Sequence, residues 1–208
     1  MWASVPRRAK PVDVLVIGSS VAEGHCAQPG QGWAALLAAA LSSTGISLAN
    51  AAVAGGDTES TMMEFEDALT QVTPRADIVS LSLANEGLPW TSTPEDAAEV
   101  AERFVYGMRA LAERVVAAGA TPILGSVYPN DQYEGMHAQV LRRVHADLAA
   151  LGWPTIDFLS ALDDSHGRWR AGAAADAGHP NDTGHRLMFE AVDLGMLTEV
   201  CKRVGAGS

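Results

Sequence analysis

The apolar positions of this chain form short continuous runs that alternate with longer periodic stretches. Runs rich in β-branched residues occupy 13–17, 77–83 and 121–127, and weaker runs occupy 46–53 and 154–159. Runs of this length, apolar throughout, are typical of strands that are buried on both faces. The pattern therefore predicts about five strands.

The stretches between these runs predict helices. Two of them repeat apolar residues every three or four positions, which builds one apolar stripe on each helix. The first stripe comprises Val100, Phe104, Met108, Leu111 and Val115, and the second comprises Met136, Val140, Val144, Leu148 and Leu151. Thr93 is placed to cap the first of these helices ahead of Pro94, and Gly119 is placed to end it. Further helices are expected over 33–41, over 62–72 and from about 180 to about 201.

Strands that alternate with helices predict right-handed crossovers and a parallel sheet with both faces covered. We therefore expect a flavodoxin-like three-layer α/β/α sandwich, with residues 1–208 as one domain and 1–11 as a short N-terminal arm. Ligands of such folds bind at the carboxyl ends of the strands. The loops that follow the runs at 13–17, 46–53 and 77–83 are expected to converge there.

Composition narrows the classes of partner. The formal charge is 14 − 25 = −11, which argues against a nucleic acid or an anionic membrane surface as the main partner. No apolar run approaches the roughly 18–20 residues of a membrane span. The basic residues at the start precede an apolar run that is too short for a signal peptide, so a cytoplasmic location is expected. Cys26 and Cys201 do not imply a disulfide framework.

Four blocks carry the candidate chemistry. They are GSSVAEG at 18–24, NAAVAGGDT at 50–58, LSLANEGL at 81–88 and DAGHPNDTGHRLM at 176–188. A serine hydroxyl needs a base within hydrogen-bond reach, and that base needs an orienting partner. His179 suits the base, and Asp176 lies three residues earlier, where a turn brings its carboxylate back to the imidazole Nδ1. The adjacent Ser19 and Ser20 both remain candidates for the nucleophile on these grounds alone.

The order and spacing of the four blocks resemble the SGNH hydrolases, also called GDSL esterases and lipases. The resemblance implies their fold and a Ser-His-Asp triad. The family pattern, Gly-Asp-Ser followed by an apolar residue and a later glycine, selects Ser20, because Val21 follows it and Gly24 lies four residues on. The resemblance also implies an oxyanion hole formed by the Ser20 amide, Gly55 and Asn85.

Three positions depart from the family pattern. Ser19 stands where the family has Asp, Ala84 where it has Gly, and Glu86 where it has Asp. None of the three is a catalytic position of the pattern. We therefore expect the departures to affect substrate choice and efficiency more than the type of reaction.

Other residues near the blocks suggest the surroundings of the site. Leu88, Trp90 and Tyr128 are expected to wall a substrate pocket, with simple packing as the alternative for each. His185 is expected to be a surface or packing residue of the last helix. His137 and His145 do not have the spacing of a metal pair, and His25 with Cys26 lacks further ligand spacing, so no metal site is predicted.

The sequence therefore predicts a serine esterase that hydrolyses a small carboxylic ester through an acyl-enzyme on Ser20, without a cofactor. An acyltransferase or thioesterase built on the same residues is an alternative. A non-catalytic flavodoxin-like module that binds a carbohydrate or an anion is a second alternative. The acyl chain length, the alcohol group and the oligomeric state do not follow from the sequence.

Overall fold

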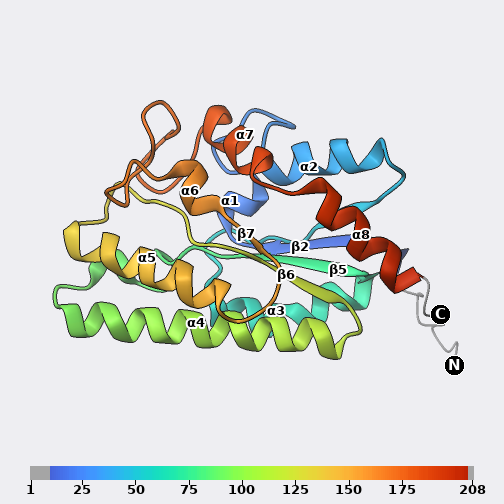
Figure 1. Ribbon diagram of the computed structural model, residues 1–208, viewed down its shortest axis with the longest axis horizontal. Helices are drawn as coiled ribbons and strands as arrows, with labels where there is room; N and C mark the ends of the chain where they lie inside the picture. Colours follow the sequence, from blue (N-terminus) through green and yellow to red (C-terminus); the bar gives the residue numbers. More distant parts are fainter. Residues whose placement is uncertain (1–9, 206–208) are drawn as a thin grey trace, which may run out of the picture.

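The computed structural model describes residues 10–205 and is built around one parallel sheet (Figure 1). The strand order is β3-β2-β5-β6-β7, and every neighbouring pair is parallel. The strands are β2 (Val14–Gly18), β3 (Leu48–Asn50), β5 (Ala76–Ser80), β6 (Thr121–Gly125) and β7 (Thr155–Ile156). All five lie within runs, or one residue beyond runs, that the apolar pattern predicts.

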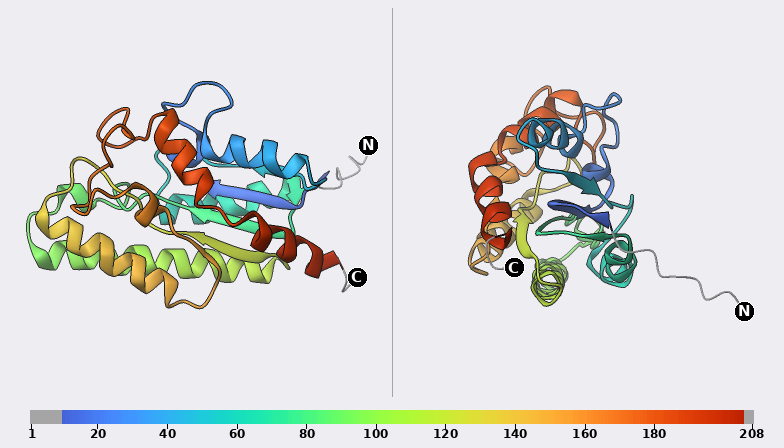
Figure 2. Two further views of the ribbon diagram at one scale, coloured as in Figure 1. Left: turned by 45° about the horizontal axis from the view of Figure 1, so that its top comes forward. Right: turned by 90° about the vertical axis from the view of Figure 1, so that its right-hand side faces the viewer.

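Helices cover both faces of the sheet (Figures 1 and 2). On one face lie α3 (Thr58–Gln71), α4 (Pro94–Ala117) and α5 (Gly135–Ala149), and on the other lie α2 (Trp33–Ser42), α6 (Phe158–Leu162), α7 (Asp182–Glu190) and α8 (Leu194–Gly205). Strand β2 divides its side chains between two cores, because Leu15 and Ile17 join the first and Val14 and Val16 join the second. The predicted three-layer α/β/α sandwich is confirmed.

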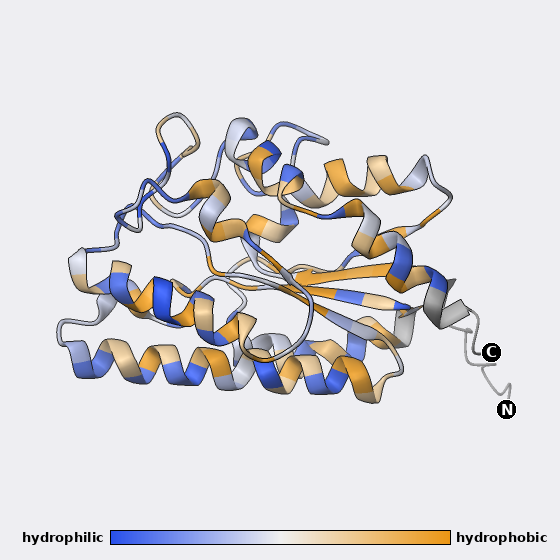
Figure 3. Ribbon diagram, viewed as in Figure 1, coloured by the Kyte–Doolittle hydropathy of each residue, from blue (hydrophilic) through white to orange (hydrophobic). Residues whose placement is uncertain are grey.

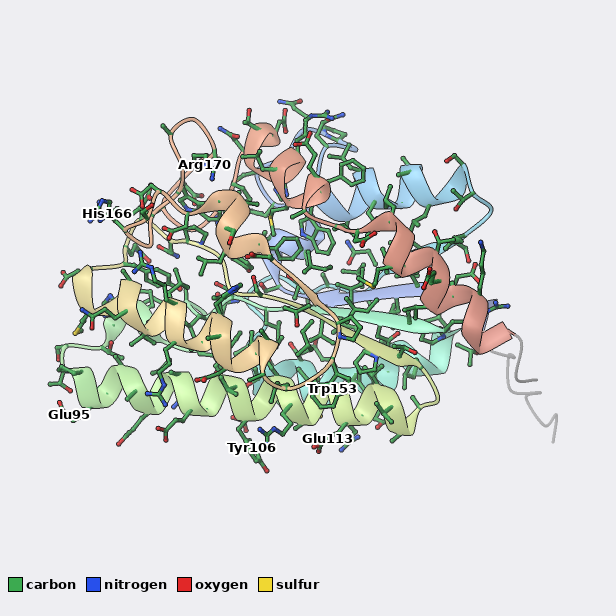
Figure 4. The ribbon with its side chains drawn as sticks, viewed as in Figure 1. Glu95, Tyr106, Glu113, Trp153, His166 and Arg170 are labelled. Atoms are coloured by element: carbon green, nitrogen blue, oxygen red, sulfur yellow. The ribbon has the colours of Figure 1, made fainter. Side chains whose placement is uncertain are left out.

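Helix α4 shows how the apolar stripe sets the packing. Its hydrophobic and hydrophilic residues alternate along the helix (Figure 3), and the predicted stripe is buried against the sheet and α5. The Thr93 side chain accepts a hydrogen bond from the Asp96 amide at 3.1 Å, which caps the helix start as expected. Tyr106 and Glu113 point outward on the opposite side (Figure 4).

Two expectations about the C-terminal third hold only in part. The run at 154–159 holds only the two-residue strand β7, because Asp157 accepts a hydrogen bond from the Ser160 amide and starts α6 there. The last helix is interrupted between α7 and α8. Asp193 accepts a hydrogen bond from the Met196 amide at 3.0 Å and caps a second helix, while Val192 turns into the core.

Two further elements differ from expectation. Helix α3 starts at Thr58 rather than at 62, because Asp57 and Ser60 form a reciprocal capping box. Of the expected N-terminal arm, residues 1–9 lie outside the described residues. The strand β1 (Lys10–Pro11) pairs with β4 (Val72–Thr73) in a small second sheet. Between residues 10 and 205, no helix is both long and apolar enough to cross a membrane.

Candidate active site

Strand β2 delivers Ser20 to the carboxyl edge of the sheet. The strand ends at Gly18, and the short helix α1 (Ser20–Glu23) begins two residues later. A side chain at Gly18 would place its Cβ 2.3 Å from the Ser80 carbonyl oxygen and 2.6 Å from the Ala22 Cβ. Only glycine therefore lets β2 pass so close to β5 while α1 turns back over the strand.

Ser20 meets His179, which lies 159 residues further along the chain. The distance from Ser20 Oγ to His179 Nε2 is 3.1 Å. On the other side of the imidazole ring, Nδ1 lies 2.9 Å and 3.0 Å from the two carboxylate oxygens of Asp176. A carboxylate only accepts hydrogen bonds, so this contact places the proton of neutral His179 on Nδ1 and leaves Nε2 to accept from Ser20.

The segment that carries Asp176 and His179 is held by backbone contacts. The Ala177 carbonyl accepts hydrogen bonds from the Trp169 indole at 2.9 Å and from the Asp131 amide at 2.8 Å. Immediately after His179, Asn181 caps α7 by accepting from the Thr183 and Gly184 amides. These contacts hold the turn that carries Asp176 and His179 in place just before α7, although the turn has no regular structure of its own.

The environment of Asp176 keeps its carboxylate charged. Partial desolvation acts to raise the pKa of Asp176, but hydrogen bonds from the Gly178 amide and from His179 outweigh it and hold the pKa below its usual value. The side chains of Asp176 and His179 are 51% and 25% exposed, so the pair lies at the surface. A charged acceptor therefore faces His179 Nδ1 at neutral pH, and the site is open to a substrate.

The neighbouring Ser19 faces away from this surface. Ser19 is fully buried, and its Oγ lies 3.4 Å from the Tyr128 hydroxyl. Tyr128 is only 3% exposed and stacks on Trp169. Tyr128 therefore lies behind the Ser20 loop as a packing residue rather than as the expected wall of a pocket. Its hydroxyl contacts the side chain of Ser19, one of the three residues that depart from the family pattern.

The candidate oxyanion residues lie on neighbouring loops. The Asn85 side-chain amide donates to the Gly56 carbonyl at 2.8 Å, and the Val53 amide donates to the Gly18 carbonyl at 2.9 Å, so these contacts join the first three sequence blocks. Gly55 is exposed and adopts a left-handed φ of 80° that favours glycine. Gly56, which the motifs of the sequence do not identify as a site residue, holds the Asn85 side chain in place through its carbonyl.

Glu86, the second departure from the family pattern, has a clear structural role. Its Oε1 accepts a hydrogen bond from the Thr58 amide at 2.7 Å, which satisfies an otherwise unpaired N–H at the start of α3. Arg103 on α4 donates both to Glu86 Oε2 and to the Glu86 carbonyl. Glu86 therefore ties α3 and α4 to the loop that carries Asn85.

The two apolar residues expected beside Asn85 occupy opposite environments. Both belong to the short 3-10 helix η1 (Leu88–Trp90). Leu88 is fully buried in the core beneath α4, so its side chain does not wall a surface pocket, and that expectation is wrong. Trp90 is 74% exposed and remains available to a ligand.

Two other histidines, His185 and His25, lie in different environments. His185 is fully buried, accepts from the Trp33 amide through Nδ1 and contacts the His25 carbonyl through Nε2 at 3.0 Å, which makes it a packing residue. His25 itself lies against His179, with 4.5 Å between ring centroids. Cys26 lies beside Asp176, with 3.7 Å between Sγ and Oδ2. No motif in the sequence predicts the contacts of His25 and Cys26 with this site, because they join residues about 150 positions apart.

Several solved structures share the fold of this chain. TesA matches with a TM-score of 0.68 and 21% identity over 92% of this chain and 99% of that chain. EstA, an esterase from Pseudoalteromonas sp., matches with a TM-score of 0.63 and 19% identity over 93% and 98%. Axe2, an acetylxylan esterase from Geobacillus stearothermophilus, matches with a TM-score of 0.62 and 17% identity over 92% and 95%. At these identities the likeness establishes the fold.

A comparison with curated protein sequences finds no match. The comparison with family profiles finds a match over residues 16–187, and this segment contains Ser20, Asn85, Asp176 and His179. Because this segment spans most of the 208 residues, the chain belongs to the GDSL-like lipase/acylhydrolase family.

Proposed function

We propose that this protein is a serine esterase whose nucleophile is Ser20. The observation that carries the proposal is the unbroken hydrogen-bonded series from Ser20 Oγ through His179 to the Asp176 carboxylate, with distances of 3.1 Å and 2.9 Å. A nucleophile, a base and an orienting group in this order form the arrangement that activates a serine hydroxyl. A module that only binds a ligand has no need for this geometry.

In the first half of the reaction, Ser20 Oγ attacks the ester carbonyl while His179 Nε2 takes the hydroxyl proton. Asp176 stabilises the resulting imidazolium and keeps its orientation. The tetrahedral intermediate then collapses, His179 returns the proton to the leaving alkoxide, and the alcohol departs. In the second half, water attacks the acyl-enzyme while His179 takes its proton. His179 then returns this proton to Ser20 Oγ as the acid departs, which restores the free enzyme.

The negative oxygen of the tetrahedral intermediate needs preorganised donors. We assign these to the Ser20 amide, the Gly55 amide and the Asn85 side chain. As the first residue of α1, Ser20 has an amide without a partner inside the helix. The bond from Asn85 to the Gly56 carbonyl uses one of its two amide protons and leaves the second for the substrate oxygen.

We propose a small carboxylic ester as the substrate. The triad lies at the surface, with half of the Asp176 side chain exposed, and Leu88 is withdrawn into the core instead of lining a deep apolar channel. Trp90, exposed on the loop that follows Asn85, is the candidate contact for the acyl or alcohol group. Transfer of the acyl group to another alcohol would use the same residues and differs only in the acceptor.

The test uses the two adjacent serines as a matched pair. Wild type, Ser20→Ala and Ser19→Ala are assayed with 4-nitrophenyl acetate and butyrate. We expect Ser20→Ala to lose about 10³-fold or more in kcat, and Ser19→Ala to stay within about tenfold of wild type. Equal rates for wild type and Ser20→Ala would overturn the proposal. Product analysis with an added alcohol separates hydrolysis from acyl transfer.

A further inference from the structure

We propose that His25, Cys26 and His179 form a binding site for a zinc ion that switches off the triad. One ligand atom from each of these side chains lies within 4.8 Å of the others. They come from two segments, the loop that follows α1 and the turn before α7, which only the fold brings together. The inhibition, although not the binding, rests on the proposed function.

The donor set favours zinc over hard cations. A thiolate and two imidazoles are the ligands that Zn²⁺ takes in proteins, whereas Mg²⁺ and Ca²⁺ require oxygen ligands. A tetrahedral zinc ion with bonds of about 2.1 Å to nitrogen and 2.3 Å to sulfur holds its donors roughly 3.5 Å apart. The donors here must close by about 1 Å, which rotation of the exposed His25 and Cys26 side chains allows.

Hydrogen bonds already hold the backbone of the loop that carries His25 and Cys26. The amides of Gly24 and His25 both donate to the Ser20 carbonyl, at 3.1 Å and 2.9 Å. The His25 carbonyl is held by the fully buried His185 at 3.0 Å. Binding therefore has to order only side chains, which keeps its entropic cost small.

The fourth coordination position of the ion is left to water. Asp176 Oδ2 lies 3.7 Å from Cys26 Sγ, beside the three ligand side chains but outside the group whose ligand atoms lie within 4.8 Å of one another. The carboxylate and the net charge of −11 also favour a cation at this surface.

Coordination by His179 is incompatible with its catalytic role. Its Nε2 faces Ser20 and its Nδ1 faces Asp176, so a metal bound to either nitrogen displaces one of the two hydrogen bonds of the triad. Bound zinc therefore removes either the base for Ser20 or the group that orients the base. Release of the ion restores the hydrogen bond that was lost.

The test measures zinc binding separately from activity. Protein freed of metal with EDTA is titrated with zinc chloride in a calorimeter, using wild type and Ser20→Ala. We expect saturable binding of one ion to both proteins and no binding of magnesium. Cys26→Ala, His25→Ala and His179→Ala are each expected to weaken the affinity for zinc by about 100-fold or more. His166→Ala is the matched control, because this exposed histidine projects from the loop between α6 and α7 (Figure 4), and it should bind as wild type does.

In the activity assay, zinc should inhibit wild type over the same concentration range, and EDTA should restore the rate. His25→Ala and Cys26→Ala should keep the basal rate and lose the inhibition. Saturable binding by a protein without esterase activity would support the zinc site and contradict the proposed function. No saturable binding by wild type, or equal affinities in Cys26→Ala and His166→Ala, would overturn the zinc site.

Discussion

At the scale of single residues, the two adjacent hydroxyls of Ser19 and Ser20 have different surroundings. The turn from β2 into α1 sends Ser19 inward to Tyr128 and presents Ser20 to His179. The imidazole is oriented by Asp176, which stays charged because the Gly178 amide and His179 stabilise the carboxylate. The proposed chemistry therefore depends on the tautomer that Asp176 imposes on His179.

Replacing this carboxylate by its amide tests that dependence. In Asp176→Asn the side chain keeps its shape but is able to present N–H groups to His179 Nδ1, which favours the tautomer that carries its proton on Nε2. We expect kcat for 4-nitrophenyl acetate to fall by about 10³- to 10⁴-fold. The melting temperature should stay near that of wild type, because this side chain is half exposed. A kcat that stays unchanged would show that Asp176 does not orient the base.

At the scale of elements, the loop after β5 is fastened to two helices. Glu86 accepts from the first amide of α3 and pairs with Arg103 of α4, while the adjacent Asn85 contacts Gly56. Glu86, which stands where the family pattern has Asp, therefore bridges the loop to both helices. The geometry of the proposed oxyanion hole is thus coupled to how α3 and α4 pack.

Removing that link is expected to affect both stability and rate. Glu86→Ala leaves the Thr58 amide without its acceptor and removes the carboxylate that Arg103 contacts, so that Arg103 keeps only the backbone carbonyl of residue 86. Loss of a hydrogen bond to a charged group costs about 1.5–3 kcal/mol. We expect the free energy of unfolding in urea to fall by this amount and kcat to fall as well, because Asn85 loses its neighbouring anchor. The control is Glu95→Ala, at an outward-pointing position in the first turn of α4 (Figure 4), which should change kcat little. Equal kcat values for the two variants would show that Glu86 does not position the loop.

The 3-10 helix η1 carries one buried side chain, Leu88, and one exposed side chain, Trp90. Leu88→Ala empties a fully buried position and should cost about 2–5 kcal/mol in the free energy of unfolding. Trp90→Ala should leave stability within about 0.5 kcal/mol, because Trp90 is 74% exposed, and should raise KM if this side chain contacts the substrate. Urea unfolding and steady-state kinetics of the two variants measure these effects. A KM for Trp90→Ala equal to that of wild type would remove Trp90 from the substrate contacts.

At the scale of the whole molecule, two cores enclose the sheet and one acidic residue lies inside it. Asp77 of β5 is fully buried, and neither of its carboxylate oxygens has a hydrogen-bond partner among the described residues. Burial raises its pKa to about 7. Since the unfolded chain has a pKa near 4 at this side chain, ionisation of Asp77 destabilises the fold progressively from about pH 4 to about pH 7, and fully above that.

This burial predicts a pH dependence that one substitution removes. Relative to wild type, Asp77→Asn should gain roughly 2–3 kcal/mol in the free energy of unfolding between pH 5 and pH 8. Urea unfolding of both proteins at the two pH values measures the difference, and other titrating groups such as His185 cancel in the comparison. A difference between variant and wild type that is the same at both pH values would contradict the shifted pKa.

The sequence predicts the sheet, the main helices and the pairing of Asp176 with His179, because each depends on local periodicity or close spacing. It misplaces the start of α3 because the capping pair Asp57 and Ser60 precedes the apolar stripe. The direction in which Leu88 points, the bridge from Glu86 to Arg103 and the contact of His25 with His179 depend on tertiary packing. No periodicity in a single chain carries that information.

The proposed function requires Ser20, rather than its neighbour Ser19, to be the nucleophile. A fluorophosphonate probe reacts with an activated serine and leaves a stable adduct, which mass spectrometry of the digested protein locates. We predict an adduct on Ser20 in wild type and in Ser19→Ala, and no adduct at either position in Ser20→Ala. An adduct on Ser19, or labelling that is undiminished in Ser20→Ala, would show that Ser20 is not the nucleophile.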